Sequence, residues 1–339
     1  MHSRNRALWL PGAALTLAAG TALVAFNRGA LPVPEGAASL VDPQPPVRAA
    51  QAAERTDAEG AGQSAPPRPA QSRPAPPRPE PNSAARTAAE AVRAALGSGA
   101  DGERLRYSIA VEDLDTGELA HSSAGSGSYD TASIVKVNIL AALLLQAQTT
   151  GVALTPEQQG EAAIMIRNSD NKATDTLWRA IGAGEGLARA NRTLGLTGTT
   201  PGSGGQWGLT QTVAEDQLRL LRAVFTRPSP LTDASQEYIQ SLMANVAADQ
   251  DWGVPAAAPD SAGFVKNGWL PRSASGRWDV NSIGRVDYAG HTLLVSVLSD
   301  RHATREAGIA LVEKAASTAV HALVAAADTP VRGPETLAR

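Results

Sequence analysis

The chain has 339 residues, a net charge of −3 and no cysteine. The charge balance gives no reason to expect binding to nucleic acid or to an anionic surface. The lack of cysteine excludes a disulfide framework, thiol catalysis and cysteine metal sites. It also excludes the lipid-modified cysteine of a bacterial lipoprotein.

An uncharged apolar segment, residues 7–26, follows Arg4 and Arg6 near the N-terminus. Such a segment is long enough to span a bilayer core of about 30 Å. Basic residues before it place the N-terminus inside and the rest of the chain outside. A cleaved signal peptide within residues 1–30 is the alternative, with Gly36-Ala37-Ala38 as a weak cleavage signal. Both interpretations predict an extracytoplasmic protein, either anchored in the membrane or secreted.

Residues 31–82 are predicted to form a disordered linker. Residues 42–81 hold eleven of the chain's 23 prolines and no aromatic residue. A stretch of this composition cannot bury a core and forms an extended spacer. A wall-spanning tether and a passive linker are both open as its role. One folded domain is predicted at residues 83–328, followed by a tail at 329–339.

Within the folded domain, the pattern first predicts a helix at 84–96 between the cap Asn82-Ser83 and Gly97. A hairpin follows, with strands at 107–112 and 119–122 around Asp115-Thr116-Gly117. Several helices are expected between 133 and 247, and strands at 262–265, 278–286 and 292–298. A helix at 303–327 ends before Pro330. We therefore expect an α+β fold, with an antiparallel sheet flanked by the N- and C-terminal helices and an all-helical subdomain.

The first candidate catalytic pair is Ser133 and Lys136, three residues apart at the start of a predicted helix. Residues at i and i+3 share a helix face, so the amine can take the hydroxyl proton. The helix that follows is apolar nearly all round, which predicts that it is buried. Burial and the positive end of the helix dipole both lower the pKa of a lysine. Taken alone, the same pattern is also explained by a serine cap and a lysine whose amine reaches solvent.

Two further groups of residues follow along the chain. Ser169-Asp170-Asn171 lies where one predicted helix ends and the next begins, so Ser169 can shuttle a proton and Asn171 can hold a substrate amide. Lys266-Asn267-Gly268 lies at the end of a predicted strand, where Lys266 can attract a substrate carboxylate. Gly268 lets a substrate backbone lie against the strand. The backbone N–H groups of Trp269 and Ser133 are candidates for an oxyanion hole. Helix caps and an Asn-Gly turn are the structural alternatives.

The order S-x-x-K, S-D-N and K-x-G is similar to the signature of class A β-lactamases and penicillin-binding proteins. From about Ser83 to Ala327 the sequence resembles the penicillin-recognising serine enzymes, and class A β-lactamases most closely. The resemblance implies roles for individual residues: Ser133 as nucleophile, Lys136 as its base, Ser169 as proton shuttle, Asn171 as amide ligand and Lys266 as carboxylate anchor.

Three features depart from the class A pattern. Asn267 stands where the family has threonine, so its amide would have to replace a hydroxyl at the substrate carboxylate. The interval between Ser133 and Ser169 is short. The stretch that corresponds to the Ω-loop, residues 194–212, contains no Asp or Glu, although class A enzymes use a glutamate there to activate the deacylating water. Gln206 in this stretch can orient a water but cannot deprotonate it.

The sequence therefore predicts an extracytoplasmic serine hydrolase that is acylated on Ser133 by β-lactams or related amides and esters, with weak turnover. A cell-wall D-Ala-D-Ala carboxypeptidase or transpeptidase and a penicillin-binding sensor without turnover are the alternatives. We expect a monomer with a small-molecule or cell-wall peptide substrate, and neither a metal nor a cofactor. Trp207 and Trp269 lie in glycine-containing segments near the predicted pocket and are candidates to line it.

Overall fold

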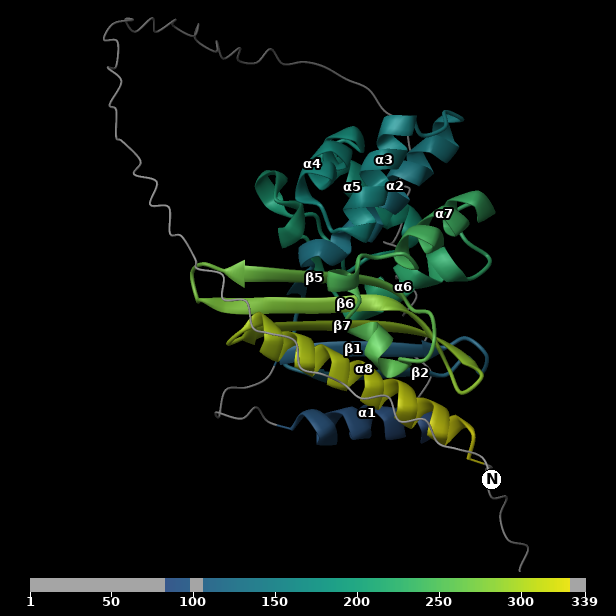
Figure 1. Cartoon of the computed structure of the whole chain (residues 1–339), viewed down its shortest axis with the longest axis vertical. Coiled ribbons are helices and arrows are strands. Elements are labelled where there is room, and N and C mark those ends of the chain that lie inside the picture. Colours follow the sequence, from purple (N-terminus) through teal and green to yellow (C-terminus); the bar gives the residue numbers. More distant parts are fainter. Residues whose placement is uncertain (1–82, 98–105, 330–339) are drawn as a thin grey trace, which may run out of the picture. The chain divides into compact units, whose positions relative to one another are not determined.

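The computed structural model describes residues 83–97 and 106–329. The predicted N-terminal segment (1–30), the linker (31–82) and the tail from residue 330 lie outside these ranges. In the described part, a five-stranded antiparallel sheet has the order β2-β1-β7-β6-β5 (Figure 1). Its strands are β1 (Arg106–Asp113), β2 (Leu119–Ala124), β5 (Phe264–Arg272), β6 (Arg277–Tyr288) and β7 (His291–His302). Strands from the two ends of the domain thus pair in the middle of the sheet, as β1 with β7.

The predicted hairpin of β1 and β2 is present, and its turn follows from local chemistry. Between β1 and β2, the buried Asp113 carboxylate accepts hydrogen bonds from the backbone N–H groups of Asp115 (2.9 Å) and Thr116 (3.3 Å). Strand β5 continues to Arg272, well beyond the predicted end at 265. The Asn-Gly pair there is typical of a turn, and the strand also contains Pro271, which an edge strand such as β5 tolerates when the proline nitrogen faces solvent.

One face of the sheet is covered by α1 (Ser83–Leu96) and α8 (Arg305–Ala327), as predicted (Figure 1). Alanine and valine side chains on α1 recur at helical spacing and are buried against β2 and α8. Helix α8 begins two residues later than predicted because the hydroxyl of Thr304 accepts the N–H of Ala307 (3.0 Å) and caps it. A core of small and branched side chains fills the space between these helices and the sheet.

The other face of the sheet supports the helical region that the sequence predicts. Its helices are α2 (Val135–Thr150), α3 (Pro156–Arg167), α4 (Asn171–Ala180), α5 (Ala183–Leu194), α6 (Ala214–Phe225) and α7 (Asp233–Met243). Five short 3₁₀ turns accompany them. Turn η1 (Ala132–Ile134) leads into α2, η2 (Ser203–Gly205) and η3 (Trp207–Leu209) lie between α5 and α6, and η4 (Ala248–Gln250) and η5 (Val254–Ala257) lie between α7 and β5. The two-residue strands β3 (Tyr129–Asp130) and β4 (Gln211–Thr212) pair with each other.

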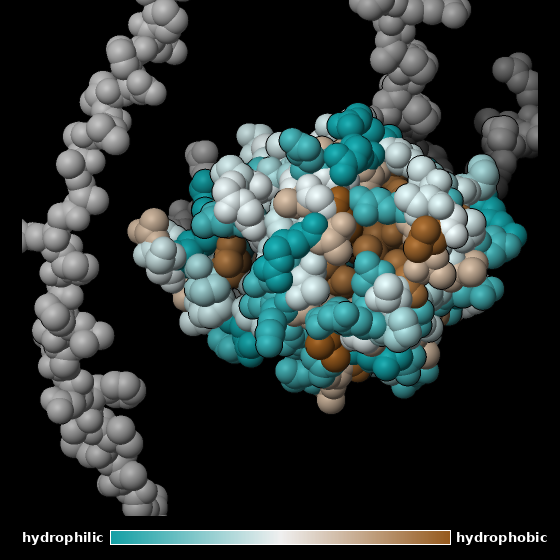
Figure 2. Space-filling model, turned by 90° about the horizontal axis from the view of Figure 1, so that it is seen from above, coloured by the Kyte–Doolittle hydropathy of each residue, from teal (hydrophilic) through white to brown (hydrophobic). Residues whose placement is uncertain are grey.

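Helix α2 is the centre of this region, and every residue from Val135 to Leu144 is buried. Together with η1, it is long and apolar enough to cross a membrane, and so is α8. In the fold, however, α2 is enclosed by its neighbours and α8 packs against the sheet, so both are explained as core helices. Seen from the helical side, the surface shows separate apolar patches among polar residues (Figure 2). The apolar sides of these helices therefore mainly face inward.

Candidate active site

Ser133 lies in η1, the 3₁₀ turn that leads from β3 into α2. The side chain of Asn281 on β6 fixes this turn, because its amide donates to the carbonyl oxygens of Asp130 (2.8 Å) and Thr131 (3.1 Å). Ala132, directly before Ser133, has a φ of +47°, a left-handed conformation that costs energy for a residue with a side chain. The surrounding contacts thus hold Ser133 in a strained and defined position.

Lys136 lies one turn further, in the first turn of α2, and is fully buried. Its Nζ lies 2.9 Å from Ser133 Oγ and 2.9 Å from Asn171 Oδ1. It also lies 2.6 Å from the carbonyl oxygen of Ser169 and 3.1 Å from Ser169 Oγ. An ammonium group has three hydrogens, so these four oxygens exceed what it can donate to. The neutral amine also serves three partners, but it has two N–H groups and one lone pair, so it can accept the proton of a hydroxyl.

The environment of Lys136 favours this neutral form. Burial lowers the pKa of Lys136 to about 7, and the nearby carboxylates of Asp170 and Asp175 only partly oppose the effect. The direction agrees with the prediction from the apolar sequence of α2. At neutral pH a large fraction of Lys136 is therefore able to accept a proton from Ser133.

Ser169 lies between α3 and α4 and joins two buried lysines. Its Oγ accepts hydrogen bonds from Lys136 Nζ (3.1 Å) and from Lys266 Nζ (3.1 Å). The backbone of Ser169 is left-handed, with a φ of +57°. Asp170 then caps α4 by accepting the N–H of Ala173 (2.7 Å), which places Asn171 as the first residue of that helix. The S-D-N sequence thus begins helix α4 and also places Ser169 and Asn171 against Lys136.

Lys266 reaches the site from β5, the edge strand of the sheet. It is 1% exposed, and its Nζ also donates to the carbonyl oxygen of Asn267 (2.8 Å). Burial lowers the pKa of Lys266 well below its usual value, and the positive charge of Lys136 adds to the effect. An incoming carboxylate would favour the charged form of Lys266, so the group is suited to binding an anion.

Gly268 brings the backbone of β5 directly against η1. A Cβ atom at this position would lie 2.6 Å from the backbone nitrogen of Ser133 and 2.8 Å from that of Ile134. Only glycine permits this approach. The next residue on β5 is Trp269, so its backbone lies beside that of Ser133 at the edge of the sheet, where the predicted oxyanion hole would be.

The structure does not bring the Asn267 side chain to the site. Successive residues of a strand point to opposite faces, and Lys266 and Gly268 face η1. The amide of Asn267 lies on the other face, where it is 1% exposed and donates to the carbonyl oxygens of Gln250 and Trp252, each at 2.8 Å. Its donors stabilise the chain around η4 and do not point toward a substrate, contrary to the role expected from the sequence.

The structure places Trp207 at the site and adds Asp175, which contacts it. The ring centroid of Trp207 lies 4.9 Å from Lys136 Nζ, and its Nε1 donates to Asp175 Oδ1 (2.8 Å). Trp207 thus lines the site, as expected for this glycine-containing segment, whereas the Trp269 ring packs against Trp252 on the other side of β5. Asp175 was missed, although it lies one helical turn after Asn171, and residues at i and i+4 share a face.

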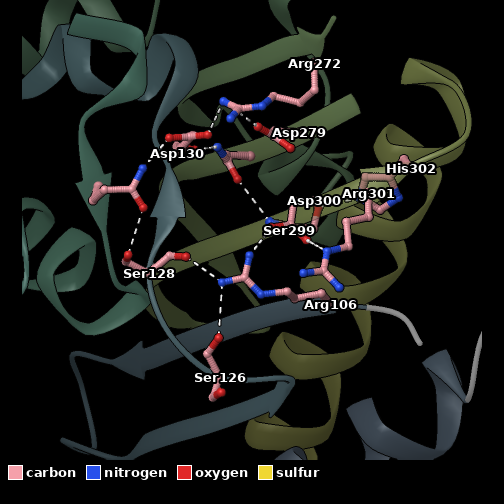
Figure 3. Close-up of polar contacts among 12 residues, drawn as sticks. Arg106, Ser126, Ser128, Asp130, Arg272, Asp279, Ser299, Asp300, Arg301 and His302 are labelled. Carbon is pink, nitrogen blue, oxygen red and sulfur yellow. Dashed lines mark hydrogen bonds and ion pairs between the residues drawn. The ribbon is translucent and has the colours of Figure 1, made fainter. Parts of the chain in front are cut away.

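A charged network around Asp130 ties β3 to the sheet (Figure 3). Asp130 accepts hydrogen bonds from Gln211 on β4 and from Arg272 at the end of β5. Arg272 also lies 3.8 Å from the carboxylate of Asp279 on β6. Burial raises the pKa of Asp279 to about 7, against the effect of Arg272, and the nearby Asp130 adds to the rise. Near neutral pH a large fraction of the Asp279 carboxyl is therefore protonated, in the network that holds β3 beside η1.

Asp279 is expected to make the stability depend on pH. Its pKa is about 7 in the folded chain, whereas the ordinary value for an aspartate is 3.8, so between these values the folded state binds more protons than the unfolded state. The free energy of unfolding should therefore fall as pH rises from 4 to 7, by up to about 1.4 kcal/mol per pH unit. Asp279→Asn should flatten this slope in denaturant titrations, whereas Asp260→Asn, at an exposed turn, should not. An unchanged slope in Asp279→Asn would contradict the assignment.

Comparison with known proteins identifies the fold that carries this site. A model of the Beta-lactamase enzyme family matches residues 158–323. A class A β-lactamase from Bacteroides cellulosilyticus superposes with a TM-score of 0.59 at 15% identity, covering 72% of this chain and 99% of that protein. PBP-A superposes with a TM-score of 0.58 at 18% identity, covering 70% and 96%. A solved variant of PBP-A is an acyl-enzyme complex with penicillin G. This chain therefore has the fold of the β-lactamase-like serine enzymes.

Among curated proteins, the chain is similar to "Putative lipoprotein LppW" of Mycobacterium tuberculosis, with 29% identity over 169 residues. The match covers 48% of this chain and 54% of that protein, so the chain spans about half the length of the curated relatives it matches. The structural matches are under 25% identical and concern the fold. What the protein acts on is therefore argued from its own site.

Proposed function

We propose that the protein is an extracytoplasmic serine hydrolase whose Ser133 is acylated by β-lactams or related amides and esters. The observation that supports this most is the contact of 2.9 Å between Ser133 Oγ and the buried amine of Lys136. Activation of a serine requires a base within hydrogen-bond distance whose pKa lies near the working pH. Lys136 meets both requirements, since burial lowers its pKa to about 7.

The remaining groups support an acyl transfer. Lys136 takes the proton of Ser133 while Oγ bonds to the carbonyl carbon of the substrate. The negative charge on the carbonyl oxygen is stabilised by the backbone N–H groups of Ser133 and Trp269. When the C–N bond breaks, Ser169 passes a proton to the leaving nitrogen and regains one from Lys136. The product is an ester on Ser133 and a free amine.

Substrate recognition is assigned to two residues of the same site. Lys266 would bind the carboxylate that β-lactams and D-Ala-D-Ala peptides share, because its buried amine lies beside Ser169 and would take up its charge next to an incoming anion. Asn171 would form a hydrogen bond with the substrate amide through its side-chain amide group. Its Oδ1 is already held by Lys136 Nζ at 2.9 Å, which leaves its amide donors for the substrate.

The predicted location remains part of the proposal. The apolar segment 7–26 would hold the domain at the outer side of the membrane, or direct its secretion when cleaved, with residues 31–82 as spacer. The relative from Mycobacterium tuberculosis is named as a lipoprotein. This sequence has no cysteine to lipidate, so the apolar segment would act in place of a lipid.

A second candidate function is a penicillin-binding protein without efficient turnover. It is favoured by the lack of Asp and Glu in residues 194–212 and by the indole of Trp207 next to Lys136. A D-Ala-D-Ala carboxypeptidase or transpeptidase shares the same acylation steps. Turnover of a D-Ala-D-Ala peptide would distinguish a carboxypeptidase or transpeptidase from a penicillin-binding protein that only senses the antibiotic.

Intact-mass spectrometry tests the proposal. The protein is mixed with excess penicillin G and sampled from seconds to hours. We expect a mass increase of one penicilloyl group, absent in Ser133→Ala, that persists beyond an ordinary catalytic cycle. Turnover in the ordinary enzyme range of about 1–10³ per second without a trapped adduct would contradict the weak deacylation. No adduct at any time would contradict the acylation itself.

A further inference from the structure

We propose that the indole of Trp207, held by Asp175, is a shield that keeps the hydrolytic water away from the Ser133 ester. The shield would prolong the acyl-enzyme, and its removal would let Asp175 act as the base that the 194–212 segment lacks. This inference rests on the proposed acylation of Ser133 and assigns a role to two residues that the class A pattern does not include.

The first argument is the position of the ring. The Trp207 centroid lies 4.9 Å from Lys136 Nζ, which itself lies 2.9 Å from Ser133 Oγ. The 3₁₀ turn η3 that begins with Trp207 packs on η1, since a Cβ at Gly208 would lie 4.0 Å from the Cα of Ala132. The indole therefore covers the amine from the side of the 194–212 segment.

The second argument is that the ring is fixed in orientation. Its Nε1 donates to Asp175 Oδ1 at 2.8 Å, from α4 on the opposite side of the site. The face of the ring attracts the ammonium form of Lys136 through a cation–π contact. A hydrogen bond at one end and the Lys136 amine at the face define the position of the indole.

The third argument is that Lys136 has no open side for water. Four oxygens of Ser133, Ser169 and Asn171 surround its Nζ within 3.1 Å, and the indole takes a further direction. A general base must be within hydrogen-bond distance of the water that it deprotonates. A water can therefore reach Lys136 only by displacing one of these groups.

Two carboxylates raise the pKa of Lys136, those of Asp170 and Asp175, and only one of them is free to act as a base. Asp170 is used as the cap of α4, where it accepts the N–H of Ala173. Asp175 is exposed, and it accepts a hydrogen bond from the indole of Trp207. The indole lies between the Asp175 carboxylate and Lys136. Removal of the indole leaves room for water, which takes about 30 Å³ per molecule in the liquid. Asp175 would then face this water with its carboxylate.

The step that the shield prevents is the hydrolysis of the ester. A water oxygen bonds to the ester carbonyl carbon while Asp175 takes one of its protons. The bond from that carbon to Ser133 Oγ breaks, and the proton taken by Asp175 passes through water to Oγ. The substrate leaves as a carboxylic acid, Ser133 regains its hydroxyl, and Lys136 stays neutral, as acylation left it.

The test combines two measurements on the full chain and its variants. The lifetime of the penicillin G adduct is followed by intact mass, and the access of reagent to Lys136 is followed by reductive methylation and peptide mapping. In Trp207→Ala we expect deacylation to be faster by about 10²-fold, the lower end of general-base effects. We also expect Lys136 to be methylated at least about 10-fold faster than in the unchanged protein.

Further variants distinguish the loss of shielding by Trp207 from a general loss of structure. Trp207→Phe keeps a ring over Lys136 and should restore most of the protection. Trp207→Ala combined with Asp175→Asn should lose the faster deacylation but keep the faster methylation, because the amide cannot take a proton. Trp278→Ala removes an indole from β6 and should change neither measurement.

The outcomes distinguish this inference from the proposed acylation. If the unchanged protein takes up no penicillin G, the acylation is wrong, and the methylation rates still decide whether Trp207 shields Lys136. Equal methylation of Lys136 in the unchanged protein and in Trp207→Ala would overturn the shield. An adduct lifetime that stays the same in Trp207→Ala would overturn its effect on hydrolysis.

Discussion

Lys136→Ala is expected to abolish the labelling of Ser133 by a fluorescent penicillin while leaving the domain folded. Lys136 Nζ lies 2.9 Å from Ser133 Oγ, and the loss of a general base typically costs about 10²–10⁴-fold in rate. Lys314→Ala, at an exposed position of α8, is the matched control and should label normally. Normal labelling of Lys136→Ala at neutral pH would show that another group takes the serine proton.

The same lysine predicts the pH dependence of labelling. Only the neutral amine can accept a proton, and burial lowers the pKa of Lys136 to about 7. The labelling rate of the unchanged protein should therefore rise through pH 7 and level off above it. The free energy of unfolding should also increase with pH. Between 7 and the ordinary lysine value of 10.5 the unfolded state binds more protons, so the free energy of unfolding should rise with pH.

Gly268→Ala is expected to have the second large effect, on both labelling and stability. Its Cβ would lie 2.6 Å from the backbone nitrogen of Ser133, so either η1 or β5 must move. A displacement of about 1 Å at a reacting group can cost about 10²-fold in rate. Forcing an additional carbon into a closely packed site typically costs about 1–3 kcal/mol of stability. Labelling kinetics and urea unfolding measure the two effects.

Gly160→Ala is the matched control for this substitution. Gly160 lies in α3 and is exposed, and a Cβ atom added to it would have no neighbouring atom within 4 Å. Alanine is favoured over glycine in a helix by about 1 kcal/mol, so Gly160→Ala should stabilise the protein and leave labelling unchanged. A Gly268→Ala variant that labels as fast as the unchanged protein would contradict the close approach of β5 to η1.

Much of the fold was predictable because its signals are local. The alanine-rich helix before Gly97 and the Asp-Thr-Gly turn follow from residues next to each other in the sequence. The end of β5 was not predictable in this way. Asn267-Gly268 and Pro271 are typical of turns, and only the edge position of β5 makes them compatible with a strand.

In the site, too, local contacts were predictable from the sequence and long-range contacts were not. The spacing of Ser133 and Lys136 predicted their contact, because both belong to one continuous turn of the chain. The direction of the Asn267 side chain depends on the register of β5 with β6, which no local pattern specifies. The contact of Trp207 with Asp175 joins a loop to a helix 32 residues away, so it depends on how the two pack.

The pairing of β1 with β7 has a consequence for the order in which reactivity appears. Arg106 pairs with Asp300, so the sheet closes only when almost the whole domain has been made. Contacts of such long range form slowly, whereas the helical region depends on closer partners. Ser133 and Lys136 belong to that region, but Lys266 and Gly268 reach them from the sheet. The chain should thus become reactive toward acylating agents only at the end of folding, which protects incompletely folded molecules from being modified.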